Sequence, residues 1–186
     1  FNGGIIMTIH FADGTTQTSA AGGKLLQVQT SQVTSHTACS PDTQLVFKDI
    51  PVSKAITPSA SSSKILISFL LFGETNNNSK DHYFRIKRAI SGGSTTFITA
   101  ADQSARTGTL LIGGMGLQDD SGSNTPTILT LSDYVDSPNT TSQVTYTIQH
   151  TSHGINTFHL NRTVDTNNQD AFEDGISWIT LKEVGA

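Results

Sequence analysis

The chain of 186 residues has little cysteine, little charge and no long apolar run. Its single cysteine, Cys39, excludes an internal disulfide and a Cys-based zinc site within one chain. Charged residues make up 14% of the chain and the formal net charge is -4, so no strong positive field is available to hold nucleic acid phosphates. No apolar run approaches the ~20 residues of a membrane span, and no basic segment precedes an apolar core as in a signal peptide. The chain opens at Phe1 rather than Met, as expected of a fragment.

Strong helix formers are also scarce, because glutamate occurs only at positions 74, 173 and 183. Serine and threonine are abundant instead, with 21 Ser and 27 Thr. Threonine favours strands over helices, and a surface of this composition is rich in hydroxyl groups rather than ions. The length suits one domain, alone or with a short arm.

The first 22 residues differ in composition from the rest of the chain. Asp13 is their only acidic residue, and Asp13-Gly14 is a turn signal. The small residues of Ser19–Gly23 then predict a flexible joint. We therefore expect an extended N-terminal arm over residues 1–22 and one domain over residues 23–186.

Short apolar runs separated by turn clusters fill the rest of the chain. The strongest is Ile65–Phe72, whose branched and aromatic residues predict a buried central strand. Only Ala100–Arg106 has the pattern of a helical turn. The pattern predicts an all-β fold, an antiparallel β-sandwich or barrel rather than a parallel α/β sheet. Further strands are expected at Leu25–Val33, Leu45–Ile50, Lys54–Ile56, His82–Lys87, Thr95–Ala100, Thr109–Ile112, Thr127–Leu131, Val144–His150, Ile155–Leu160 and Ile176–Val184.

Several segments, taken in order, resemble bacteriophage virion proteins. Residues 11–18, Phe-Ala-Asp-Gly-Thr-Thr-Gln-Thr, resemble a short module of phage tail fibres. Residues 23–28, Gly-Lys-Leu-Leu-Gln-Val, resemble the start of a jelly-roll module of marine phage virion proteins. The similarity continues through Ile56–Leu66, Leu131–Pro138, Thr145-Tyr146, Asn161-Arg162 and Ile179–Val184. The resemblance implies a jelly roll of the tumour-necrosis-factor or C1q type, which usually trimerises.

The same resemblance implies a non-enzymatic virion structural protein on the surface of the extracellular particle. Such a protein is a homotrimeric fibre or knob on the phage tail that attaches to a host-surface glycan, and three weak sites raise its avidity. Its arm joins it to other tail or capsid proteins. The resemblance implies no cofactor, nucleic acid or membrane insertion, and no fixed set of receptor-binding residues.

Other functions stay open from the sequence. One is a capsid decoration protein, head fibre or adaptor of the virion. An alternative of another class is a polysaccharide depolymerase on a β-sandwich scaffold, and a third is a secreted carbohydrate-binding module. Clustered carboxylates in a groove favour the enzyme, and an exposed aromatic platform favours the binding module. Candidates for such a platform are Tyr83, Tyr134, Tyr146 and Trp178, although we expect Trp178 in the core.

Three histidines, His150, His153 and His159, have a spacing that allows convergence on zinc, with His153 in a turn and the other two on neighbouring strands. Surface or loop histidines without a metal are the interpretation we favour. Two polar loops, Asp119–Asn124 and Asp165–Asp170, offer oxygen ligands for calcium. Neither loop has the final Glu of the EF-hand pattern, so we expect no metal there either.

Motifs for catalysis are missing or weak. No Gly-x-Ser-x-Gly elbow occurs, and Gly113–Gly116 lacks the Gly-Lys-Ser/Thr of a phosphate loop. Asp133 and Asp136 are better interpreted as turn residues than as the carboxylate pair of a glycosidase. Cys39 is interpreted as a loop thiol. Glycosylation sequons begin at Asn77, Asn139 and Asn161, and matter only if a eukaryote secretes the chain.

The strongest apolar runs carry more hydrophobic pattern than one sandwich needs. Ile65–Phe72 is apolar on both faces and Ile176–Leu181 is nearly so, whereas a strand with one face in solvent should alternate. Either neighbouring subunits of a trimer or a long loop such as Val164–Gly175 must cover the outer face. The resemblance favours the trimer, with Ile179 facing outward.

Overall fold

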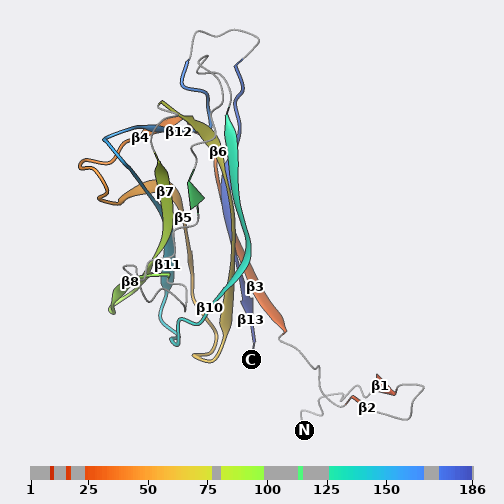
Figure 1. The fold of residues 1–186 in the computed structure, drawn as a ribbon. Coiled ribbons are helices and arrows are strands. Elements are labelled where there is room, and N and C mark those ends of the chain that lie inside the picture. Colours follow the sequence, from red (N-terminus) through yellow and green to blue (C-terminus); the bar gives the residue numbers. More distant parts are fainter. Residues whose placement is uncertain are drawn as a thin grey trace.

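The computed structural model describes residues 24–76, 81–98, 126–165 and 172–185, together with the backbone of residues 9–10, 16–17 and 113–114. All regular elements of this part of the chain are strands. No helix long and apolar enough to cross a membrane is found there. The strands form two antiparallel sheets that pack face to face (Figure 1). The predicted all-β antiparallel sandwich is therefore confirmed.

The larger sheet has six strands and the smaller has five. The larger sheet consists of β3 (Leu25–Val33), β13 (Ser177–Val184), β6 (Lys64–Thr75), β12 (Phe158–Leu160), β4 (Thr37–Cys39) and β10 (Thr127–Asp136). Within it β6 is central, because β13 and β10 pair along its two sides. The smaller sheet has the order β5 (Lys48–Ile56), β11 (Val144–Ser152), β7 (His82–Ile90) and β8 (Thr95–Phe97), and β9 (Gly113–Gly114) also pairs with β7.

The connectivity of the eight main strands is that of a jelly roll. Numbered 1 to 8 along the chain, these strands are β3, β5, β6, β7, β8, β10, β11 and β13. The larger sheet then has the order 1-8-3-6 and the smaller sheet the order 2-7-4-5. Every connection except that from the fourth to the fifth strand passes from one sheet to the other, which is the double-sheet arrangement of jelly rolls. This connectivity confirms the predicted jelly roll.

The core lies between the two sheets and is filled by alternate residues of each strand. On β6 these are Ile65, Ile67, Phe69 and Leu71, all 0% exposed. Ile179 and Leu181 of β13 lie opposite Phe69 and Ile67 and are equally buried. The smaller sheet contributes an inward set of the same kind: Val52, Phe84, Ile86, Val144, Tyr146 and Ile148.

One carboxylate, Glu183, is fully buried at the edge of this core, opposite Ile65. Its oxygens accept hydrogen bonds from Gln27 Nε2 (2.6 Å) and from the N–H and hydroxyl of Ser59 (2.7 Å each). Burial alone raises the pKa of a carboxyl group, but these hydrogen bonds outweigh it and lower the pKa of Glu183 to about 2. Glu183 therefore ties β3 and β13 to the connection between β5 and β6.

The structure differs from the sequence prediction at Pro51. The sequence predicts two segments, Leu45–Ile50 and Lys54–Ile56, but a single strand, β5, runs from Lys48 through Pro51 to Ile56, and residues 45–47 precede it. A proline has no N–H to donate, and β5 tolerates Pro51 because it lies at the edge of its sheet.

Of the N-terminal arm, the structure describes only β1 (Ile9–His10) and β2 (Thr16–Gln17), which pair antiparallel. The predicted turn at Asp13-Gly14 and the predicted joint at Ser19–Gly23 lie outside the described residues, as do Thr109–Ile112 and Ala100–Arg106.

Candidate functional site: the outer face of the larger sheet

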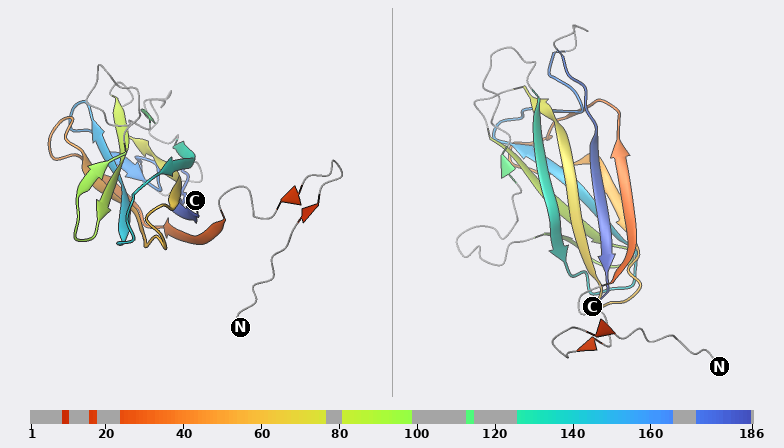
Figure 2. Two further views of the ribbon diagram at one scale, coloured as in Figure 1. Left: turned by 90° about the horizontal axis from the view of Figure 1, so that it is seen from below. Right: turned by 90° about the vertical axis from the view of Figure 1, so that its right-hand side faces the viewer.

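The outward residues of β6 are apolar, although they face away from the core. Because strand residues alternate between faces, Leu66, Leu70 and Phe72 point to the opposite side from Phe69 and are half-buried. Figure 2 (right) shows β10, β6, β13 and β3 lying side by side across this face. In the folded sheet, both faces of β6 are therefore apolar, as the sequence predicts.

Neighbouring strands extend the apolar surface in register with β6. Trp178 lies beside Leu70, Val135 beside Leu66, and Ile128 beside Phe72. Val28 on β3 lies beside Lys182, one strand further out. We call the following set the outer apolar face: Val28, Leu66, Leu70, Phe72, Ile128, Val135 and Trp178. Val28, Ile128 and Val135 are 49%, 56% and 56% exposed.

A polar row crosses the middle of this face. The Ser68 hydroxyl and the Asp133 carboxylate are joined at 3.0 Å, and Lys182 Nζ donates to the same carboxylate at 2.9 Å. Hydrogen bonds from Lys182 and Ser68 lower the pKa of Asp133. Thr30 and Thr180 continue the row through their hydroxyls, 3.0 Å apart. In the middle of this face, the charges of Asp133 and Lys182 therefore neutralise each other.

One end of the face is covered by the segment that follows β12. The N–H of Asn161 donates to the Phe72 carbonyl (2.8 Å), and the N–H of Val164 donates to the buried Glu74 carboxylate. Gly175 lies so close to Phe72 that a Cβ there would be 2.3 Å from the ring. The segment Val164–Gly175, expected as the alternative cover, thus contacts one end of β6, while Val28 and Val135 remain about half exposed.

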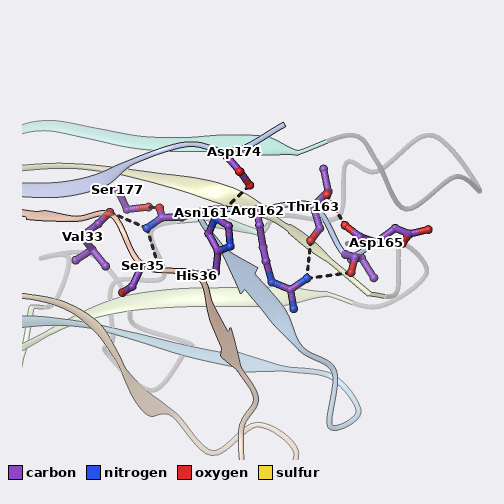
Figure 3. Close-up of polar contacts among 10 residues, drawn as sticks. Val33, Ser35, His36, Asn161, Arg162, Thr163, Asp165, Asp174 and Ser177 are labelled. Carbon is purple, nitrogen blue, oxygen red and sulfur yellow. Dashed lines mark hydrogen bonds and ion pairs between the residues drawn. The ribbon is translucent and has the colours of Figure 1, made fainter. Parts of the chain in front are cut away.

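Asn161 anchors that segment. Its side chain is fully buried, and its Nδ2 donates to the carbonyls of Val33 (2.6 Å) and Ser35 (3.1 Å). Its Oδ1 accepts from the Ser177 hydroxyl at 2.6 Å (Figure 3). Arg162 curls back onto its own segment and donates to the carbonyls of Thr163 and Val164. Nearby, His36 Nε2 lies 3.1 Å from an Asp174 carboxylate oxygen (Figure 3).

Two expectations about β13 were wrong. Ile179 faces the core rather than outward, and Trp178 faces outward rather than into the core. The pairing of Ile179 with Phe69 fixes this phase, because directly opposite residues share a face. Of the other aromatic candidates, Tyr146 is fully buried, whereas Tyr83 and Tyr134 are half-buried.

The three predicted histidines do not converge. His150 lies on β11 of the smaller sheet, His159 on β12 of the larger sheet, and His153 is exposed between them. Among the described residues, no group of three His, Cys, Asp or Glu side chains is arranged to hold a metal ion. Burial, reinforced by Arg162, lowers the pKa of His159 to about 4.

His150 instead pairs with His82, a contact that the sequence did not reveal. The His82 Nδ1 and His150 Nε2 atoms are 3.0 Å apart, the rings stack, and both side chains are buried. Burial, and then the charge of His82, lower the pKa of His150 to about 3. His150 is therefore neutral at neutral pH and packs as part of the core against Phe84.

Cys39 was expected in a loop but lies buried in β4. It borders a cavity of about 200 Å³ that is also lined by His150, Lys48 and Asp49. Burial raises the pKa of the Cys39 thiol to about 12. A thiol held protonated at neutral pH is a poor nucleophile, so the surroundings of Cys39 do not activate it.

The remaining predicted sites are also accounted for where the structure describes them. Asp133 and Asp136 lie within β10 rather than in a turn. Asp136 is buried and accepts hydrogen bonds from Arg88 (2.7 and 3.0 Å) and from the Tyr146 hydroxyl (2.7 Å).

The structure describes only some of the predicted loops and glycosylation sequons. The Asp165 carbonyl accepts a hydrogen bond from Thr163, while residues 119–124 and 166–170 lie outside the described residues. Gly113 and Gly114 pair with β7 rather than forming a loop. Of the sequon residues, Asn139 is exposed, Asn161 is too buried to carry a glycan, and Asn77 is outside the described residues.

Comparison with known proteins gives no family assignment. No protein-family model matches the chain, and no curated protein matches it either. Among solved structures, that of the infectious bursal disease virus Gx strain aligns at 14% identity with a TM-score of 0.42. This alignment covers 96% of this chain and 44% of the viral chain. The VP2 subviral particle of the same virus aligns at 11% identity with a TM-score of 0.41, covering 96% and 46%. The chain thus spans less than half the length of these viral proteins, and similarity at this level carries no functional argument.

Proposed function

We propose that the chain is a non-enzymatic virion structural protein, a fibre or knob subunit that forms a homotrimer through the outer apolar face. One observation carries the proposal. Of the ten large apolar side chains that are exposed among the described residues, five lie on β3 and β10, the strands that flank this face: Leu25, Leu26, Val28, Ile128 and Val135. Contiguous apolar surface of this kind marks an interaction site, because isolated monomers rarely expose it.

A second copy of the chain suits this surface. The central charges, Asp133 and Lys182, form their own ion pair, so the middle of the face carries no net charge when two copies meet there. The Thr30–Thr180 hydroxyls already bond to each other, which lowers the cost of removing them from water. The family resemblance of the sequence supports three copies rather than two.

Light scattering tests the trimer. The native protein at micromolar concentration should have three times the monomer mass of 19.8 kDa. Val135→Asp places a charge on the proposed interface, where burial without a partner is costly, and should give monomers. Ile155→Asp is the matched control, because Ile155 is similarly exposed at 62% but lies in the connection between β11 and β12. A native monomer, or equal dissociation by both variants, would contradict the proposal.

The position on a phage tail and attachment to a host glycan are further parts of the proposal, supported by the sequence resemblance and by a surface rich in hydroxyl groups. Electron microscopy of labelled particles separates a tail location from a capsid decoration or head fibre. The absence of catalysis is supported by the engagement of Asp136 with Arg88 and Tyr146. Incubation with acidic and neutral polysaccharides should release no reducing ends.

A further inference from the structure

The outer face of the smaller sheet carries an arginine held between two aromatic rings. Arg85 points outward from β7, since its neighbours Phe84 and Ile86 fill the core. Its guanidinium carbon lies 3.9 Å from the ring centre of Phe47, just before β5, and 3.6 Å from that of Phe97 on β8. Each ring favours the cation through its π face. The hairpin of β7 and β8, together with Phe47 from an earlier segment, therefore fixes the guanidinium in place.

A chain of hydrogen bonds holds the inner edge of the same guanidinium. Arg85 Nε donates to Gln149 Oε1 (2.7 Å), and Gln149 Nε2 donates to Asp49 Oδ1 (2.7 Å). The other Asp49 oxygen pairs with Lys87. Burial alone raises the pKa of Asp49, but the hydrogen bonds from Lys87 and Gln149 and the charges of Lys87 and Arg85 lower it below its ordinary value.

This arrangement leaves a directed positive group. Asp49 is neutralised by Lys87, so the cluster of Asp49, Lys87 and Arg85 keeps one net positive charge. Arg85 uses only its Nε in hydrogen bonds to the described residues, and its terminal nitrogens remain as donors. A guanidinium fork that is fixed before binding recognises a carboxylate through two parallel hydrogen bonds. Phe97 is 36% exposed beside it and offers apolar surface to the body of a ligand.

We propose that the Phe47–Arg85–Phe97 stack is a binding site for the carboxylate of an acidic saccharide, such as a uronic acid unit of a surface polysaccharide. The inference rests on the proposed attachment function and specifies its ligand. The Arg85 terminal nitrogens bind the carboxylate, and the exposed part of Phe97 packs against the sugar ring. Neutral sugars lack the group that satisfies the guanidinium, which makes charge the basis of selection.

Isothermal titration calorimetry with a galacturonic acid tetrasaccharide tests the site. The native protein should bind it, and should bind the fully methyl-esterified tetrasaccharide at least tenfold more weakly. Arg85→Lys keeps the charge but loses the planar fork, and should weaken binding at least tenfold. Lys48→Gln is the control, because it removes a positive charge from the exposed Lys48–Asp42 pair at the edge of the same sheet, and should change affinity less than twofold.

Several results would overturn the site. These are no binding by the native protein, equal binding of the ester, equal affinity of Arg85→Lys, or equal weakening by Lys48→Gln, which would indicate non-specific charge attraction. Equal binding of a tetraglutamate peptide would show recognition of carboxylates without the sugar. Melting temperatures of all variants check that they fold. Binding of neutral saccharides alone would keep the attachment function while removing this site, and light scattering tests the trimer separately.

Discussion

Replacement of Asn161 should be among the most destabilising changes of a polar side chain in this protein. Its amide makes three hydrogen bonds in a fully buried position, joining the end of β3, the start of β13 and the segment that covers β6 (Figure 3). Its backbone is left-handed, with φ of 64°. Asparagine tolerates this conformation better than other residues with a Cβ.

The magnitude follows from these two contributions. In Asn161→Ala, the Val33 and Ser35 carbonyls and the Ser177 hydroxyl lose partners, and leaving a buried polar group unsatisfied costs roughly 1–3 kcal/mol. Ser177 retains its hydrogen bond from the Phe72 N–H, so we count the loss as about 3 kcal/mol. The left-handed backbone adds about 1 kcal/mol for alanine. Asn161→Ala should therefore cost about 4 kcal/mol, and Asn161→Gly about 3 kcal/mol.

Asn139 provides the matched control. It has the same left-handed backbone, with φ of 53°, but is exposed, and its side chain forms no hydrogen bond with the described residues. Asn139→Ala should cost only about 1 kcal/mol and Asn139→Gly about zero. Urea denaturation followed by fluorescence of Trp178, the only tryptophan, measures all four at one protein concentration, because oligomerisation makes stability depend on concentration. If Asn161→Ala cost no more than Asn139→Ala, the buried amide would contribute nothing and the reasoning would fail.

Three further predictions concern acid and packing. The pKa of His150 is about 6.5 in the unfolded chain and about 3 in the folded protein. The free energy of unfolding should therefore fall as pH drops from about 6.5 to 5, by up to about 1.4 kcal/mol per pH unit. The variant His150→Gln should flatten that slope, and the variant of the exposed His153, His153→Gln, should not. Glu183 keeps its charge down to about pH 2, so the stability lost in Glu183→Gln should be full above pH 4.5 and shrink as pH falls further, as urea titrations at pH 7 and pH 3 would show. Gly73→Ala would place a Cβ 2.2 Å from the His159 carbonyl and 2.7 Å from the Phe158 ring. It should destabilise the protein by about 1–3 kcal/mol, the usual cost of overpacking, and lower the melting temperature accordingly. An unchanged melting temperature would show that β12 shifts freely.

The sandwich could be predicted from the sequence because its signals are local. Ile65–Phe72 has the composition of a central strand, and β6 is central. The phase of β13 could not be predicted, because Ile176 and Trp178 suit one face as well as Ile179 and Leu181 suit the other. Pairing with β6 decides between them, and pairing is a contact between residues more than a hundred positions apart.

The contacts that form candidate sites have the same non-local character. His82 and His150 are 68 positions apart, and Arg85 on β7 meets Phe47 from the segment before β5, although its other partner, Phe97, lies on the adjacent hairpin strand β8. No spacing rule links such residues, since jelly-roll connections carry neighbouring strands to opposite sheets. The histidine spacing that did suggest a site failed for this reason, because the chain passes from β11 to β12 and so from one sheet to the other.

The outer side of β6 bears on the two explanations that the sequence left open for its apolar pattern. The described loop cover lies at one end of the strand, because the Asn161 and Gly175 contacts concern Phe72 and its end of β6. It gives no reason for Leu66 at the other end, beside the exposed Val135. A strand that needed only the loop would keep apolar residues under the loop and polar ones elsewhere. Among the described residues, the apolar pattern instead continues past this cover and onto two neighbouring strands, which supports the proposed interface with another copy.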